Sequence, residues 1–168
     1  MFDTPYIFSR LNDQSDAGAA LAGLLADARA AGDNSDAFIF SFGDMLTKET
    51  STQRTYLLAH DGRLVVGMVI LVIDPAVTLP GVAQLKGIIT RSAYRRKGLA
   101  TQLLGMAGKL AAENDKRILT LETATGDHPA HFFKKTGFAI NSNVPAFSSM
   151  ADGRIIDTVI YWKRVDSA

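Results

Sequence analysis

The sequence predicts a single α/β domain with a mixed sheet, and two patterns lead to this prediction. First, strand-like and helix-like segments alternate in the middle of the chain, over 82–90, 99–114, 117–124 and 129–136. Parallel strands need a crossover, usually a helix, so this alternation predicts parallel pairing at the centre of the sheet. Second, strand-like runs flank that centre, which favours antiparallel neighbours around it, at 55–60, 64–73, 138–141 and 155–164.

The composition is that of an ordinary globular protein. Of the 168 residues, 47% are hydrophobic and 21% are charged, which argues against disorder and fits one domain over 1–168. The chain has no cysteine, so disulfides, a thiol nucleophile and a thiolate metal site are excluded, and a cytoplasmic protein is the simplest expectation. No apolar run approaches the roughly 20 residues of a membrane helix, and residues 1–10 lack a signal-peptide pattern. We therefore expect no membrane partner.

The N-terminal half begins with an alanine- and leucine-rich helix, predicted over 17–31. Asp16 is its expected N-cap and Gly32 its expected end. A second short helix is predicted near 42–50. The pair Asp61-Gly62 then predicts a hairpin turn between the two following strands.

Several glycines mark places where the backbone is expected to bend or to pack closely. Gly67 and Gly87 each lie inside a predicted strand, which indicates a bulge or a close approach of another group. Gly105 and Gly108 weaken the helix over 99–114 by about 1 kcal/mol each relative to alanine, which predicts tight packing on the sheet. The apolar face of that helix is formed by Leu99, Leu103, Leu104, Ala107, Leu110 and Ala111.

The C-terminal part contains one short helix and two strands. The helix over 129–136 is expected to end at Gly137. Residues 142–150 are predicted as a loop, and Asp152-Gly153 as a turn before the last strand.

A basic turn, Arg95-Arg96-Lys97-Gly98-Leu99-Ala100, separates strand 82–90 from the helix that follows. No acidic residue occurs from Pro75 to Ala112, although the net charge of the chain is only +1. The first N–H groups of a helix lack partners and its dipole adds positive potential, so the turn predicts an anion site. A near-neutral chain with one basic window fits a small-anion binder better than a nucleic-acid-binding module, so no nucleic-acid partner is expected.

The strand, the turn and the helix together resemble the GNAT superfamily of N-acetyltransferases over residues 55–140. The signature Arg/Gln-x-x-Gly-x-Gly/Ala is met by Arg95, Gly98 and Ala100, and an aromatic pair followed by Gly-Phe is met by Phe132-Phe133 and Gly137-Phe138. Nearer the C-terminus, segments such as Val144-Pro145-Ala146-Phe147 look like the tabtoxin-resistance group, which acetylates small amine-bearing molecules.

This resemblance implies the GNAT fold, a mixed central sheet of about six to seven strands flanked by about four helices. It also implies transfer of an acetyl group from acetyl-CoA to the amine of a small molecule, by direct attack in a ternary complex. We expect the amine to enter beside residues 32–52 and 141–150, because specificity tends to reside on irregular segments. A homodimer is a further expectation to be tested.

The resemblance assigns the residues that would bind acetyl-CoA. Its phosphates would lie against the N–H groups and charges of Arg95, Arg96, Lys97, Gly98, Leu99 and Ala100. The main chain of Ile88, Ile89 and Thr90 would pair with the pantetheine arm and polarise the thioester carbonyl.

Phe133 stands where GNAT enzymes usually carry the tyrosine that protonates the leaving thiolate, and it is placed in the cofactor site on that ground. Its ring, like those of Phe132 and Phe138, also fits a place in the core. Phenylalanine has no proton to give, and neither Tyr94 nor Tyr161 is favoured as a substitute. An acyl-CoA-binding sensor with weak or no activity is therefore the alternative function.

Glu122 is the candidate general base for the incoming ammonium, and it matches a carboxylate that the tabtoxin-resistance group has on the same strand. The alternatives are that Glu122 faces solvent or pairs with a neighbouring arginine or lysine. Asp127, His128 and His131 could suggest a metal site, but Pro129 interrupts the helix start, and solvated polar residues are favoured. No metal is therefore expected.

Overall fold

A seven-stranded mixed sheet forms the centre of the computed structural model, which describes residues 6–11, 14–30, 54–74, 78–124, 129–149 and 153–165. The strand order is β1-β2-β3-β4-β5-β7-β6. Among the strands that the structure describes, β4 and β5 pair in parallel and every other neighbouring pair is antiparallel. The strands are β1 (Ile7–Leu11), β2 (Arg54–Asp61), β3 (Leu64–Val72), β4 (Val82–Thr90), β5 (Ile118–Ala124), β6 (Ala139–Ser149) and β7 (Ile155–Arg164).

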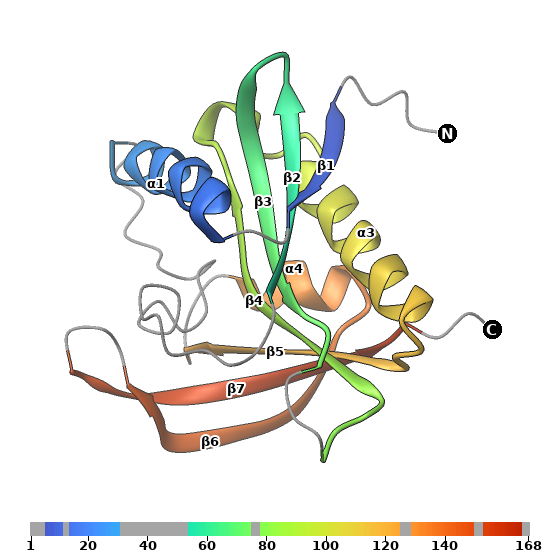
Figure 1. The fold of residues 1–168 in the computed structure, drawn as a ribbon. Coiled ribbons are helices and arrows are strands. Elements are labelled where there is room, and N and C mark those ends of the chain that lie inside the picture. The colour runs from blue at the N-terminus through green and yellow to red at the C-terminus, as the bar shows by residue number, and fades with distance from the viewer. Residues whose placement is uncertain are drawn as a thin grey trace.

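Helices cover both faces of this sheet (Figure 1). On one face α1 (Gln14–Ala30) packs on β2, β3 and β4 through Leu21 and Leu24. On the other face α3 (Leu99–Glu113) and α4 (Pro129–Lys135) enclose the larger core. A short 3-10 helix, η2 (Ser92–Tyr94), connects β4 to the turn before α3. The helix predicted near 42–50 lies outside the described residues.

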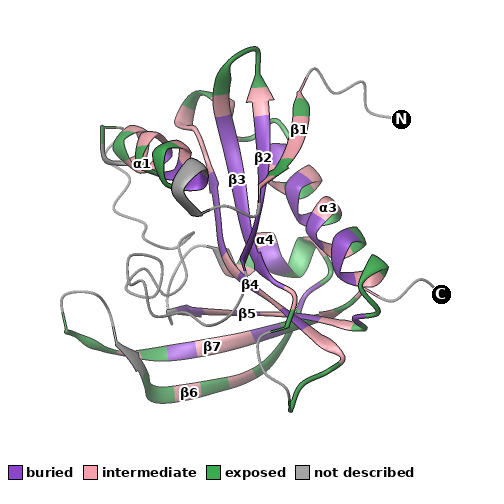
Figure 2. Ribbon diagram, in the orientation of Figure 1, coloured by how far each residue is buried: buried purple, intermediate pink, exposed green. Residues whose placement is uncertain are grey.

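The prediction of an α/β fold with a parallel centre is confirmed, and several boundaries agree with the structure. β4 and β7 span the predicted residues, and the six apolar side chains predicted for α3 are all buried against the sheet (Figure 2). The helix predicted over 17–31 begins earlier, at Gln14, so Asp16 lies inside its first turn and is not its N-cap. Aspartate is favoured in the first turn of a helix as well as at the N-cap, so its position in the sequence does not fix the residue at which the helix begins.

Two strand predictions were wrong. β1 was not predicted, because a five-residue segment at the edge of a sheet carries almost no alternating pattern. The loop predicted over 142–150 is mostly strand, since β6 continues to Ser149. Register shifts after Ile140 and Val144 place bulges in β6, and Pro145 lies in the second of them, where an edge strand tolerates proline.

Gly67 provides a stability test of the packing of β3 against α3. A Cβ at Gly67 would lie 2.9 Å from Leu103 Cδ1, whereas a Cβ at Gly105, on the exposed side of α3, would meet nothing within 4 Å. The close approach predicted for Gly67 is thus confirmed, and the tight packing predicted for Gly105 is wrong. We expect Gly67→Ala to lower the free energy of unfolding by about 1–3 kcal/mol through overpacking. Gly105→Ala should raise it by up to about 1 kcal/mol.

Urea denaturation of both variants measures these two changes in the free energy of unfolding. The pair is matched, because each variant adds one methyl group in place of a glycine hydrogen. Equal effects in the two variants would contradict the close packing of β3 on α3.

Candidate active site

The sheet opens between its two parallel strands, β4 and β5, and the predicted site residues other than Phe133 lie on these strands or in the turn that follows β4. β4 and β5 pair only over their first three residues, from Val82↔Ile118 to Gln84↔Thr120. Beyond that point β3 is the partner of β4 within the described part of the chain. The register of β4 against β3 shifts there, because Leu71 pairs with Leu85 whereas Ile70 pairs with Gly87, which leaves Lys86 as the extra residue of a bulge. The predicted bulge at Gly87 is confirmed.

The closed end of the opening is held by hydrogen bonds between the segments that precede β4 and β5. The carbonyl of Gly81 accepts the N–H groups of Arg117 and Ile118 at 2.8 and 3.1 Å. The buried ammonium of Lys116 donates to the carbonyl of Pro80 at 2.9 Å and pairs with Asp74. The two strands therefore start from a fixed junction and separate from there.

The last residues of β4 turn part of their main chain toward the opening. Arg91, which follows β4, donates its N–H to the carbonyl of Val66 at 2.8 Å, on the β3 side. Successive residues of a strand point their peptide groups to opposite sides, so those of Ile88 and Thr90 face away from β3, toward the opening. The side chains of Ile88 and Ile89 are buried in the two cores, on opposite faces of the sheet. Ile89 points its peptide groups toward β3, as Arg91 does, so the groups that face a ligand in the opening are those of Ile88 and Thr90, and the expected main-chain role of Ile89 is not supported.

The basic turn leads from η2 into α3, and its backbone has two positive φ angles. Arg96 and Gly98 both adopt left-handed backbone conformations, with φ of 60° and 79°. Lys97 separates these two residues, so the backbone bends sharply just before α3, and successive N–H groups in a turn conformation can bind an anion. Gly98 is the N-cap of α3, and Gln102 donates the first intrahelical hydrogen bond, to the carbonyl of Gly98. The N–H groups of the three residues before Gln102 therefore have no acceptor within the helix.

The side chains of the turn differ in their positions. Arg96, Lys97 and Gly98 are exposed, whereas Leu99 is buried and can contribute only its N–H. Arg95 Nε donates to the carbonyl of Thr90 at 3.3 Å, which joins the turn to the end of β4. Lys97 Nζ lies 5.6 Å from the centre of the Tyr94 ring.

These residues fit the phosphates of acetyl-CoA. The first turn of α3 contains no acidic residue, and a Cβ placed on Gly98 would meet no atom within 4 Å. The space in front of Gly98 is therefore open, and the charges and N–H groups around it all favour an anion.

Glu122 lies on the opposite wall of the opening, past the paired part of β5. It pairs with Ile160 of β7, and its side chain is half-buried. Leu119 and Leu121 belong to the core under α3 and α4, so the side chain of Glu122 points to the other face of the sheet. No ion pair joins Glu122 to a lysine or arginine within the described ranges, so the alternative that it is paired is not supported there.

Phe133 is part of the core. Its side chain is 0% exposed, and its ring centre lies 5.7 Å from that of Phe138 and 5.4 Å from that of Tyr161. The structure therefore supports the core position for this ring, and any contact with a cofactor would require a ligand to enter that core.

Neither tyrosine considered as a proton donor is well placed. Tyr94 donates its hydroxyl to Asp61 Oδ2 at 2.6 Å, and this hydrogen bond raises the pKa of Tyr94. Burial raises the pKa of Tyr161, whose side chain is 2% exposed. Both phenols therefore keep their protons more strongly than a free tyrosine does.

Two carboxylates that bind η2, the segment just before the basic turn, could not be predicted from the sequence. Asp27 of α1 contacts Ser92, and Asp61 at the end of β2 contacts Tyr94. Both are far from the turn along the chain, and no local motif marks either one. His131 is exposed, Asp127 and His128 lie outside the described residues, and the part of the chain that is described holds no cluster of three metal-ligating side chains.

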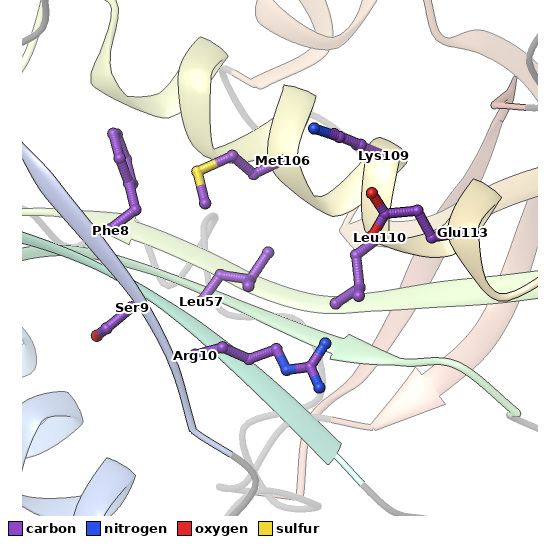
Figure 3. Close-up of a pocket in the computed structure, with 8 residues that line it drawn as sticks. All are labelled: Phe8, Ser9, Arg10, Leu57, Met106, Lys109, Leu110 and Glu113. Atoms are coloured by element: carbon purple, nitrogen blue, oxygen red, sulfur yellow. The ribbon is translucent and has the colours of Figure 1, made fainter.

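A cavity of about 310 Å³ lies apart from this site, between β1 and the second half of α3 (Figure 3). Its apolar residues are Phe8, Leu57, Met106 and Leu110, and charged side chains from both elements surround them. None of the predicted site residues lines this cavity. No helix among the described ranges is long and apolar enough to cross a bilayer.

The fold and the opening fit a class of protein that holds a long anionic ligand along a strand, with its charged end at a helix start. A model of the acetyltransferase (GNAT) family matches residues 22–138, a span that contains β4, β5, the turn and Phe133. The chain therefore belongs to the GNAT acetyltransferase family, whose acetyl donor is acetyl-CoA. None of the curated proteins matches the chain significantly.

Solved structures support the same fold at low sequence identity. The ribosomal-protein-S18-alanine N-acetyltransferase of Escherichia coli is 18% identical, with 97% of this chain and 96% of that chain covered and a TM-score of 0.68. An aminoglycoside 6'-N-acetyltransferase in complex with coenzyme A is 18% identical, with 96% of this chain and 98% of that chain covered and a TM-score of 0.67. The yncA protein of Salmonella typhimurium, solved with its cofactor acetyl-CoA, is 14% identical, with 98% of this chain and 96% of that chain covered and a TM-score of 0.70.

Proposed function

We propose that this protein is an acetyl-CoA-dependent N-acetyltransferase that acetylates the amine of a small molecule by direct attack in a ternary complex. The observation that carries the proposal is the opening between β4 and β5, which has the basic turn at one end and Glu122 on its far wall. The similarity of the C-terminal segments to the tabtoxin-resistance group supports a small amine as the acceptor.

In this proposal the protein binds acetyl-CoA mainly through backbone N–H and C=O groups. The N–H groups of the turn, together with the charges of Arg96 and Lys97, hold the phosphates. The peptide groups of Ile88 and Thr90 face the opening and can hydrogen-bond the pantetheine arm and the thioester carbonyl. These groups belong to a strand already paired with β3, so they are held in place before any ligand arrives.

Glu122 accepts the proton of the incoming ammonium, directly or through water, so that the neutral amine can attack. The leaving thiolate is released without an assisting acid. This is tolerable, because a thiol has a pKa of about 8.5 and its anion is a reasonable leaving group. The burial of Phe133 and Tyr161, and the bond from Tyr94 to Asp61, support this part of the proposal.

Thiol release from acetyl-CoA, measured over a panel of small amines, amino acids, aminoglycosides and peptides, tests the proposed function. We expect turnover with at least one small amine and none without an acceptor. Tight binding of acetyl-CoA with no turnover on any acceptor would favour the alternative, an acyl-CoA-binding sensor, for which the core position of Phe133 is the specific support.

A cytoplasmic location and a homodimer belong to the same proposal. The absence of cysteine supports the first. Exposed apolar side chains on the edge formed by β6 and β7 support contact with a second copy, and they include Ile140, Phe147, Ile155 and Trp162.

A further inference from the structure

Asp27 connects α1 to the segment that leads into the basic turn. It lies three residues after Leu24, the fully buried centre of the apolar stripe of α1, so its carboxylate is on the side of the helix that faces the sheet. Its side chain is 20% exposed. A carboxylate in such a position is costly unless hydrogen bonds satisfy it, so its partners indicate what it does.

Three contacts from the segment after β4 satisfy this carboxylate. The N–H of Ser92 donates to Asp27 Oδ2 at 2.7 Å, and the Ser92 hydroxyl donates to Oδ1 at 3.2 Å. The guanidinium of Arg91 lies 3.9 Å from Oδ1 and also donates through Nε to the carbonyl of Val65 at 3.2 Å. Asp27 therefore does for η2 what an N-cap side chain does for a helix, although it is 65 residues away along the chain.

The position of Ser92 determines where the basic turn begins. The carbonyl of Ser92 accepts the N–H of Arg95 at 3.3 Å, and the carbonyl of Arg91 accepts the N–H of Tyr94 at 2.9 Å. Arg95 opens the turn, and its side chain returns to Thr90. A shift of Ser92 would therefore move the N–H groups of the turn relative to the end of β4.

We infer that Asp27 is a positioning residue for the acetyl-CoA site: from α1 it holds η2 in place, and η2 in turn fixes the basic turn in its anion-binding geometry. The inference rests on the proposed role of the turn. Asp27 is negatively charged, so its carboxylate would repel a bound anion and does not itself bind one. Its effect must come from holding N–H groups in place, which lowers the cost of binding.

The test is the dissociation constant of acetyl-CoA, measured by isothermal titration calorimetry for the wild type, Asp27→Ala and Asp27→Asn. We expect Asp27→Ala to weaken binding about tenfold, with kcat for a good acceptor nearly unchanged. Asp27→Asn keeps an acceptor for the Ser92 N–H, replaces the other oxygen by an NH2 group that can donate to the Ser92 hydroxyl, and loses the charge toward Arg91. It should therefore restore most of the affinity.

Two further variants keep the result interpretable. Asp74→Asn removes a carboxylate from the Lys116 contact at the closed end of the opening, and it should change the melting temperature without changing the dissociation constant. Gly98→Glu tests the turn itself. Loss of binding in Gly98→Glu with wild-type affinity in Asp27→Ala would overturn the role of Asp27 alone, whereas wild-type affinity in both would overturn the assignment of the turn. A lower melting temperature in Asp27→Ala, with unchanged affinity of the folded protein, would also overturn the inference.

Discussion

Gly98→Glu should abolish measurable binding of acetyl-CoA, with a dissociation constant raised about 100-fold or more. Two effects act together. The backbone of Gly98 has a φ of 79°, a left-handed conformation that costs a residue with a Cβ about 1–2 kcal/mol. The new carboxylate would also occupy the open space in front of the N–H groups of α3 and repel phosphates there.

The matched control is Gly153→Glu. Gly153 is also exposed and has a φ of 86°, and a Cβ placed on it would meet no atom within 4 Å, but it lies in the turn before β7. This variant therefore introduces the same charge and similar backbone strain away from the basic turn. Calorimetric titration of acetyl-CoA into both variants measures the difference, and equal affinities would contradict the assignment of the turn.

Glu122→Gln should lower kcat by about 100-fold or more near neutral pH, in the range that general-base catalysis contributes. An alkyl amine has a pKa near that of lysine, about 10.4, so at neutral pH almost all of it is protonated and a base is required. As the pH rises toward the pKa of the amine, the free amine becomes available without help. The defect of the variant should therefore shrink at high pH.

The measurement is a pH–rate profile of the wild type, Glu122→Gln and Glu113→Gln, with the acceptor identified by the amine panel. Glu113 is an exposed glutamate at the end of α3, so its replacement controls for the loss of one negative charge. A constant ratio of wild-type to Glu122→Gln rates across the pH range would remove Glu122 from the mechanism.

The parts of the fold that carry strong local patterns could be predicted from the sequence. The apolar face of α3 and the span of β4 are examples, because each buries a regular set of side chains. β1 and the second half of β6 could not, since edge strands are stabilised by pairing more than by their own side-chain pattern. Polar residues and Pro145 made β6 look like a loop.

The candidate site divides in the same way. The turn was predictable because glycine and consecutive basic residues at a helix start have a local physical meaning. A core position was among the predictions for Phe133, but its contact with Tyr161 arises only through the pairing of β5 with β7. Asp27 and Asp61 likewise meet η2, the segment before the turn, only after folding, so no sequence pattern could assign them.

The junction at Gly81, Lys116 and Asp74 has a consequence for the thermodynamics of binding. Because hydrogen bonds hold β4 and β5 together at one end and the bulge at Lys86 separates them beyond it, the gap belongs to the folded chain itself. No strand pairing has to be broken when a ligand enters. The entropy of ordering both strands is lost during folding, so it is not lost again when the ligand binds.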